Sequence, residues 1–305
     1  MEHFVQQEAS QDFNKARSRE IFSRIINALT PSRHEMLSLQ EVREVIKPKS
    51  ESYRGMQVVP ISKIVGSEGR YRDFNRSFLP RRENMRRRWT SVDRAHLSDV
   101  ILPPIKLYEI GGVYFVRDGN HRVSVARSQG VESIDAEVTS LGSEITLSPD
   151  LTREKLQAAV IDYEKKRFYE ETGFNRLFPD YDLQFTETGR YDAIIDHINH
   201  HKYYINQHQS GEIPYEVALR SWFKNVFKPV IEVIEEERVT SRFPGRTPAD
   251  LYVWTVKHWD ELKQRYGQEF PIEEAVRDYN NRFGRGLWRR LKDRLFGRGR
   301  RPSAD

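Results

Sequence analysis

The sequence of 305 residues contains no cysteine. The absence of thiols excludes disulfides, thiolate metal sites and a cysteine nucleophile, and it fits a reducing cytoplasm or a hot habitat. The sequence also has no apolar run of about 18 residues, the length that spans a membrane, and its first residues lack the features of a signal peptide. We therefore expect a cytoplasmic protein that is long enough for two domains.

An excess of positive charge is confined to the C-terminal end. The formal net charge is +5, but residues 285–305 contain eight Lys or Arg and two Asp, so this segment carries +6 and the other 284 residues sum to −1. Its apolar residues fall at helical spacing, opposite basic ones. This pattern predicts a basic amphipathic tail that attaches to an anionic lipid surface or to nucleic acid, or whose apolar stripe docks on its own domain.

Residues 113–131 carry the clearest chemical signal. An apolar strand leads into Asp118-Gly119-Asn120-His121-Arg122 and then directly into a short helix. A strand that enters a helix through glycine leaves backbone N–H groups free at the positive end of the helix dipole, and the arginine adds a cation. The motif therefore suits a phosphate group. The alternative is a polar cap that closes a strand-to-helix turn.

The surrounding pattern predicts a small mixed sheet. A strand opens at 58–61, and two further strands at 105–110 and 113–117 are joined by Gly111-Gly112, a strong hairpin signal. A helix over 121–129 ends at Gly130, and the alternation over 134–138 supplies a fourth strand. Beyond about residue 142 the apolar period becomes helical. The predicted fold class is therefore α+β, with an all-α domain after the sheet.

Residues 57–140 resemble the ParB/sulfiredoxin superfamily. ParB-type domains carry a Gly-Glu-Arg-Arg-x-Arg-Ala-Ala box. In this chain Gly119, Arg122 and Ala126 match the Gly, the second Arg and the last Ala of that box. Sulfiredoxins have Gly-Cys-His-Arg at this turn, and here Asn120 replaces the cysteine, so sulfinate repair by a thiol is excluded. Free-serine kinases have Asp-Gly-x-x-Arg, which residues 118–122 match. The resemblance implies binding of a nucleotide (ATP, ADP or CTP), with Mg²⁺ as an accompanying ion.

Each residue of the turn has a role that suits phosphate chemistry. Gly119 lets the backbone approach an anion, Asn120 is a good N-cap, and Arg122 offers a planar fork of donors. Asp118 or His121 can exchange a proton with a reacting hydroxyl, and Glu68 is a second acidic candidate by its position in the kinase branch. The predicted catalytic residues are Asp118, His121 and Glu68, and the predicted phosphate ligands are Gly119, Asn120, His121, Arg122 and Ser124.

Arginine is concentrated in the insert between the first two predicted strands. Residues 66–94 contain nine Arg against four acidic residues. Arginines beside a phosphate-binding turn raise the local concentration of anions and can contact a nucleotide or a nucleic-acid backbone. The alternative is a solvated face with salt bridges. The predicted anion contacts are Arg70, Arg72, Arg87 and Arg88.

The expected organisation has four parts. Residues 1–56 form a helical segment and a linker, 57–142 the phosphate-binding domain, 143–284 the helical domain and 285–305 the basic tail. In the helical domain His197 and His201 are four residues apart and can share a metal ion, although hydrogen bonding beside a core is the commoner role for such histidines. We predict no metal site there.

Two classes of function follow from the sequence. The first is a nucleotide-binding, ParB-like regulator that associates with DNA, and a homodimer is compatible with it. The second is an enzyme, either a nucleotide hydrolase or a kinase of the free-serine type in which Asp118 or Glu68 activates a small hydroxyl substrate. No helix-turn-helix follows the fourth predicted strand, and no metal-binding carboxylate cluster of a nuclease is present.

Overall fold

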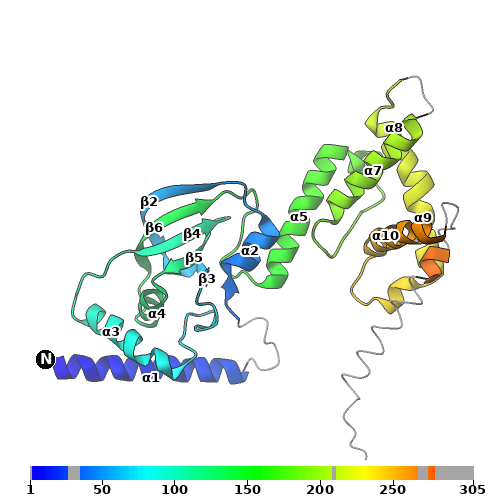
Figure 1. Ribbon diagram of the computed structural model, residues 1–305. Helices are drawn as coiled ribbons and strands as arrows, with labels where there is room; N and C mark the ends of the chain where they lie inside the picture. The colour runs from blue at the N-terminus through cyan, green and yellow to red at the C-terminus, as the bar shows by residue number, and fades with distance from the viewer. Residues whose placement is uncertain (1, 27–34, 208–210, 267–273, 279–305) are drawn as a thin grey trace, which may run out of the picture. The chain divides into compact units, whose positions relative to one another are not determined.

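The protein has an α+β fold with a mixed sheet followed by helices (Figure 1). The computed structural model describes residues 2–26, 35–207, 211–266 and 274–278. The predicted tail at 285–305 lies outside the described residues. Contacts divide the chain into two compact units, residues 1–160 and 161–305. Among the described residues, no helix is long and apolar enough to cross a membrane.

The first unit contains a six-stranded sheet with the order β1-β3-β5-β4-β6-β2. The pairs β1/β3, β3/β5 and β4/β6 are parallel, whereas β4/β5 and β2/β6 are antiparallel. The predicted hairpin at Gly111-Gly112 is confirmed as β4 and β5. The strands are β1 (Leu37–Ser38), β2 (Glu51–Pro60), β3 (Ile64–Ser67), β4 (Ile105–Ile110), β5 (Val113–Asp118) and β6 (Ser133–Leu141).

Helices cover one face of this sheet in two layers. Helix α4 (Asn120–Ser128) presents Val123 to the sheet core and Val125 to a cluster with Phe13 of α1 (Glu2–Ile26) and Trp89 of α3 (Arg86–Leu97). Figure 1 shows α4 against the sheet, with α3 and α1 beyond it. Helix α4 is therefore packed against the sheet on one side and against α1 and α3 on the other.

Side-chain hydrogen bonds lock the smaller elements in place. Arg127 of α4 donates to the carbonyls of Ile61 at 2.9 Å and Ile64 at 2.6 Å, and thereby ties the 3₁₀ turn η2 (Ile61–Lys63) and the start of β3 to the helix. Helix α2 (Leu39–Ile46) begins with a capping box between Ser38 and Glu41. A second 3₁₀ turn, η3 (Glu83–Met85), precedes α3.

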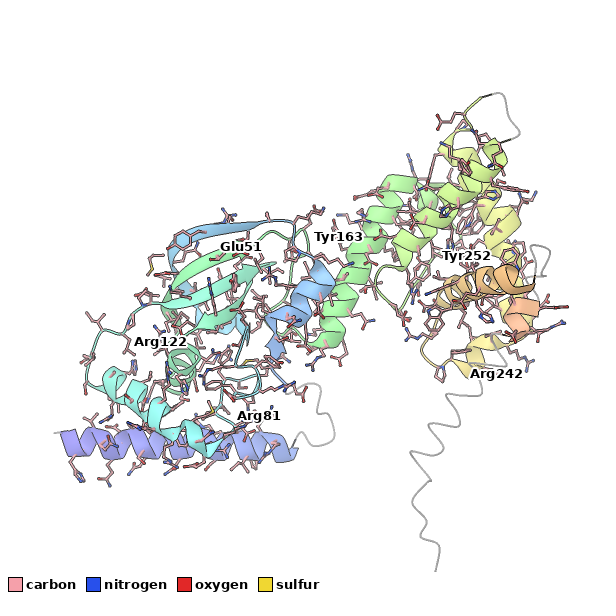
Figure 2. The ribbon with its side chains drawn as sticks, viewed as in Figure 1. Glu51, Arg81, Arg122, Tyr163, Arg242 and Tyr252 are labelled. Carbon is pink, nitrogen blue, oxygen red and sulfur yellow. The ribbon has the colours of Figure 1, made fainter. Side chains whose placement is uncertain are left out.

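The prediction that a linker extends to residue 56 was wrong from Glu51 onward. Glu51, labelled in Figure 2, begins β2, which pairs with β6 from Glu51↔Leu141 to Pro60↔Ser133. The strand lies at the edge of the sheet and exposes most of its side chains, so its residues are as polar as those of a loop. The short strands β1 and β3 were also missed, because two to four residues show no usable period.

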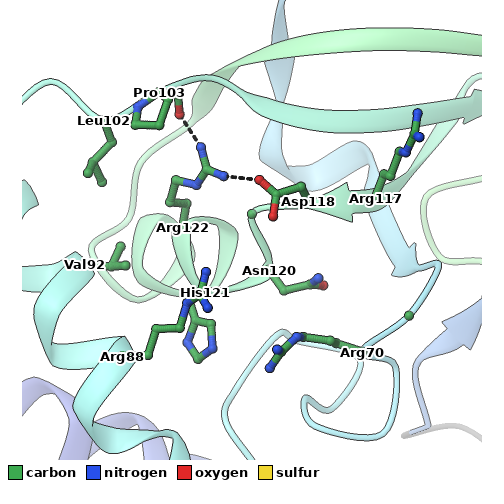
Figure 3. Close-up of a pocket in the computed structure, with 12 residues that line it drawn as sticks. Arg70, Arg88, Val92, Leu102, Pro103, Arg117, Asp118, Asn120, His121 and Arg122 are labelled. Carbon is green, nitrogen blue, oxygen red and sulfur yellow. Dashed lines mark hydrogen bonds and ion pairs between the residues drawn. The ribbon is translucent and has the colours of Figure 1, made fainter.

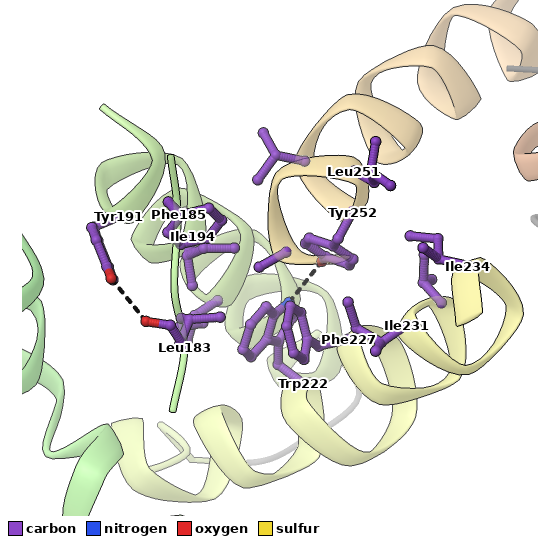
Figure 4. Close-up of a cluster of buried hydrophobic side chains, with 14 of the residues drawn as sticks. Leu183, Phe185, Tyr191, Ile194, Trp222, Phe227, Ile231, Ile234, Leu251 and Tyr252 are labelled. Carbon is purple, nitrogen blue, oxygen red and sulfur yellow. Dashed lines mark hydrogen bonds between the residues drawn. The ribbon is translucent and has the colours of Figure 1, made fainter. Parts of the chain in front are cut away.

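The second unit is helical, as predicted, and packs around an aromatic core. Trp222, Phe227 and Tyr252 are completely buried, and the Trp222 indole lies 3.2 Å from the Tyr252 hydroxyl, to which it donates (Figure 4). Helix α5 (Arg153–Thr172) spans the boundary between the units. The remaining helices are α6 (Phe174–Leu177), α7 (Arg190–Asn206), α8 (Tyr215–Trp222), α9 (Lys228–Glu236), η5 (Val239–Arg242) and α10 (Pro248–Tyr266).

A π-helical turn lies just before Pro229. Residues Phe223–Phe227, labelled η4, have π geometry between α8 and α9, and Pro229 lies in the first turn of α9. Proline has no N–H to donate, so a shift of the hydrogen-bond register just before it accommodates the ring without ending the helical path.

Candidate functional site

The turn between β5 and α4 requires glycine at position 119. Gly119 has φ 105° and ψ 20°, a left-handed conformation that residues with a Cβ rarely adopt. A Cβ added there would lie 2.4 Å from Cγ2 of Ile105 on β4. The close packing of the turn against β4 therefore depends on the missing side chain, and the turn directs α4 away from the end of β5.

A pocket of about 500 Å³ opens at this turn (Figure 3). We call it the cationic pocket because four arginines and only one carboxylate line it. Its residues come from the segment after β3, from α3, from the loop before β4, from the end of β5 and from the first turn of α4. They are Gly69, Arg70, Arg88, Val92, Leu102, Pro103, Arg117, Asp118, Gly119, Asn120, His121 and Arg122.

The first turn of α4 has no side-chain cap. The first helical hydrogen bond runs from the N–H of Val123 to the carbonyl of Gly119. The N–H groups of Asn120, His121 and Arg122 therefore precede the hydrogen-bonded ladder, at the positive end of the helix dipole. The prediction that Asn120 is the N-cap was wrong, because Gly119 occupies that position and Asn120 begins the helix.

Two buried polar atoms at the pocket lack partners within the described part of the chain. Asn120 is 6% exposed and His121 is 7% exposed, and neither Oδ1 of Asn120 nor Nδ1 of His121 makes a hydrogen bond there. Figure 3 shows both side chains extending from the start of α4 toward Arg70 and Arg88. Buried polar groups are nearly always satisfied in folded proteins, so these two atoms indicate a place for a polar ligand or water.

His121 is a neutral imidazole at physiological pH. Burial, together with the nearby cations Arg88 and Arg70, lowers its pKa from 6.5 to about 4, and Asp73 acts in the opposite direction. The ring also packs edge-on against Phe74, with centroids 5.3 Å apart. A neutral imidazole can donate one hydrogen bond to a phosphate oxygen without a proton being transferred.

The guanidinium of Arg122, predicted as a phosphate ligand, makes several hydrogen bonds within the protein. Its guanidinium donates to the carbonyls of Pro103 and Pro104, the latter at 2.9 Å, and to Oδ2 of Asp118 at 2.6 Å. The side chain is 15% exposed, whereas Asp118 is 59% exposed. Arg122 therefore fixes the loop before β4 to the start of α4, and much of its donor capacity is already in use.

The other three arginines of the pocket are more available. Arg70 and Arg88 are exposed and were predicted as anion contacts, and the structure brings both to the turn. The side chain of Arg70 makes a long ion pair with Asp73, at 3.5 Å. Arg117, which sequence reasoning missed, lies 5.5 Å above the Tyr108 ring. The signal in the sequence was its position, because Arg117 is the first charged residue after the buried Phe115 and Val116 and precedes the turn.

Four predicted residues do not line the cationic pocket. Ser124 is 1% exposed and its Oγ accepts the indole N–H of Trp89 at 2.9 Å, so the geometry does not support a phosphate contact. Arg87 is exposed on α3 and lies outside the pocket. Arg72 lines a different cavity, near α2. Glu68 is exposed, and its N–H donates to the carbonyl of Val116 at 2.9 Å, which places its backbone beside β5.

His197 and His201 contact different partners in the second unit. The His201 Nε2 lies 2.9 Å from Oγ of Ser221 on α8, and the His197 ring packs against Tyr252 on α10, with centroids 5.7 Å apart. Burial lowers the pKa of His201. Within the described ranges, no group of three or more His, Cys, Asp or Glu is arranged to hold a metal ion.

Comparisons of the chain with models of protein families, with curated proteins and with solved structures found no match. The interpretation of the site therefore depends on its own chemistry. The pocket combines exposed arginines, the N–H groups that precede the hydrogen-bonded ladder of α4, and the buried Nδ1 of His121, which lacks a partner in the described part of the chain. Such a set of donors can bind an anion with several oxygens, and a phosphate group has the required charge and acceptors.

Proposed function

We propose that the first unit binds the phosphate groups of a nucleotide in the cationic pocket. The observation that carries the proposal is the buried Nδ1 of His121, which has no partner in the described part of the chain and lies in the same pocket as Arg70 and Arg88. In its N–H tautomer this nitrogen would donate to an anion in the pocket, and the anion would offset the mutual repulsion of the arginines. Oδ1 of Asn120 only accepts, so its partner would be a water or a hydroxyl group of the ligand.

The resemblance of residues 57–140 to the ParB/sulfiredoxin superfamily agrees with this proposal, because its branches use the same turn for nucleotide phosphates. Of the two classes, we favour a regulator that associates with DNA over an enzyme. Exposed arginines outside the pocket, such as Arg72 and Arg87, are available to a nucleic-acid backbone. The carboxylate of Asp118 is already ion-paired to Arg122 and so is less suited to accept a proton.

A kinase or hydrolase remains the second candidate. One observation favours it, namely that Asp118 lines the same pocket as the arginines and is 59% exposed. Since Asp118 is the only carboxylate among the described residues that line the pocket, Mg²⁺ would be held mainly by the phosphate oxygens of the ligand. Turnover of ATP that depends on a small hydroxyl substrate, and that is lost in Asp118→Asn, would establish the enzyme and replace our preferred class.

Neighbouring arginines on α3 provide a matched test of nucleotide binding. Arg88 and Arg87 are both exposed, but only Arg88 lines the pocket. We expect Arg88→Ala to weaken binding of ATP, ADP or CTP roughly tenfold, because a charge-assisted hydrogen bond contributes about 1.5–3 kcal/mol. Arg87→Ala should bind as the wild type does. The measurement is calorimetric titration of the full chain, with and without duplex DNA.

The same titration identifies the outcomes that contradict the proposal. If the wild type binds none of the three nucleotides, the proposed function is wrong. Equal affinities of the Arg88→Ala variant and the wild type would place the ligand elsewhere. An effect of DNA on the nucleotide affinity would support the regulator, whereas its absence would remove the argument for DNA association.

A further inference from the structure

Three helices of the first unit bring two carboxylates to one amide group. Nε2 of Gln129, the C-cap residue of α4, donates to Oδ1 of Asp93 on α3 at 2.8 Å and to Oδ2 of Asp12 on α1 at 3.1 Å. The two carboxylates lie close together because they accept from the same nitrogen. We call Asp12, Asp93 and Gln129 the carboxyl junction.

Asp93 is the buried member of the carboxyl junction. It is 0% exposed, and within the described ranges its Oδ2 has no hydrogen-bond partner. Asp12 is 17% exposed, and its Oδ1 accepts from Nζ of Lys15 at 2.9 Å. A buried carboxylate with an unpaired oxygen is costly when it is ionised, whereas the protonated acid carries no charge. Burial therefore favours a proton on Asp93 more than on Asp12.

The surroundings of Asp93 also act on its protonation. Burial raises the pKa of Asp93 above the usual 3.8, and the hydrogen bond from Gln129 acts in the opposite direction. The negative charges of Asp12 and Glu8, both on α1, raise this pKa as well, while His96 on α3 lowers it. From α4 the facing group is the uncharged amide of Gln129. Ionisation of Asp93 thus places like charges across the contact between α3 and α1.

The apolar contact that holds α1 is small. Phe13 is the only large apolar side chain among the fully buried residues described for α1, and it packs against Trp89 of α3. The other buried residues are Ala9, Ala16 and Glu20. Arg86 of α3 adds a hydrogen bond to Asn14 at 2.6 Å. With so little apolar surface, the charge state of Asp93 contributes substantially to the free energy of docking α1.

We propose that the carboxyl junction is a proton-dependent contact, which holds α1 against α3 and α4 when Asp93 is protonated and loosens when Asp93 is ionised. The sign follows from burial. The pKa of Asp93 is raised where α1 is docked, so its contribution to docking is present in full below pH 3.8 and is lost as the pH rises through the raised pKa. Loosening would uncover the apolar contact between Phe13 and Trp89. This regulation does not depend on the proposed binding of nucleotide.

Asp93→Asn reproduces the uncharged state at every pH. Asparagine has the shape of the protonated acid, and its carbonyl can accept from Gln129. Amide hydrogen exchange of the full chain, expressed as protection factors to remove the intrinsic effect of pH, reports the docking of α1 by itself. We expect the wild-type protection factors of α1 to fall as the pH rises from about 4 to about 8. Those of Asp93→Asn should be about tenfold higher than the wild-type values at the upper end.

A comparison of the two proteins at each pH cancels the contributions of the other titrating groups, including His121. Asp135→Asn is the matched control, because Asp135 is an exposed carboxylate of the same unit, and it should leave the protection of α1 at the wild-type value. Equal protection of α1 in Asp93→Asn and the wild type over the whole range would overturn the proposal. Lower protection in Asp93→Asn would also overturn it, because the ionised form would then hold α1. If Asp93→Asn does not fold, the wild-type series decides, and protection that stays constant or rises with pH would overturn the proposal.

Discussion

At the scale of a single residue, burial changes the protonation of His121. Its pKa of about 4 in the folded chain lies below the usual 6.5, because the ring is buried and faces Arg88 and Arg70. The folded state therefore disfavours the charged imidazole. A bound phosphate would reverse part of this effect, because a negative group beside the ring favours its protonation.

Acid should destabilise the first unit through His121. The folded pKa is depressed, so the stabilising contribution is present in full above pH 6.5 and is lost as the pH falls from 6.5 to about 4. The loss is at most roughly 3 kcal/mol in the free energy of unfolding. We expect urea unfolding of the wild type to show this slope and His121→Gln to lack it. Parallel pH profiles of the two proteins would contradict the assignment.

The arginines that line the cationic pocket have two different roles. Arg122 has most of its donors on protein carbonyls and on Asp118, while Arg70, Arg88 and Arg117 extend into the pocket with few contacts. Substitution of Arg122 would release the proline segment as well as remove a cation. Arg88 is therefore the better probe of ligand binding, since the structure gives it no anchoring role.

At the scale of elements, the contact of α3 with α4 includes a polar pair inside an apolar layer. Trp89 is completely buried between α1 and α4, packs edge-on against Phe13 at 5.6 Å between centroids, and donates its indole N–H to Ser124. The pair holds α3 in the position from which Arg88 reaches the pocket.

Ser124→Ala separates a structural role from a ligand role. We expect a loss of roughly 1–3 kcal/mol in the free energy of unfolding, because the buried indole N–H of Trp89 would lose its acceptor. Nucleotide affinity under conditions where the variant is folded should stay at the wild-type value. Urea unfolding and calorimetric titration measure the two quantities. A weakened affinity with unchanged stability would restore Ser124 as a phosphate ligand.

At the scale of the whole molecule, the candidate site belongs to one unit. All described residues that line the cationic pocket fall between 69 and 122, within the first unit. The second unit has its own core, centred on Trp222, Phe227 and Tyr252.

Phe227→Ala should therefore weaken the second unit without changing nucleotide binding. Phe227 is completely buried and packs against Trp222 at 5.0 Å and Tyr252 at 4.8 Å between ring centroids. Its truncation should lower the free energy of unfolding by about 3–5 kcal/mol. Titration at a temperature where both units are folded should give the wild-type affinity. A reduced affinity there would mean that the second unit contributes to the site.

The sequence determined the α+β class, the hairpin at Gly111-Gly112, the strand-turn-helix around Gly119 and the main helices of the second unit. These features depend on periodicity and on glycine, which are local properties. The sequence did not identify β2 as a strand, because an edge strand with exposed side chains has the composition of a loop. Only its pairing with β6 gives it a structure.

The tertiary structure decided which charged and polar side chains share the site. Arg87 and Arg88 are neighbours in sequence, but the helical rotation of about 100° per residue sends them to different surfaces. Ser124 and Arg122 are both polar residues of α4. Ser124 accepts a hydrogen bond from Trp89 of α3, whereas Arg122 donates to Pro104 in the loop before β4. The full lining of the cationic pocket could not be predicted either, because its walls come from segments that meet only when α4 packs between the sheet and α3.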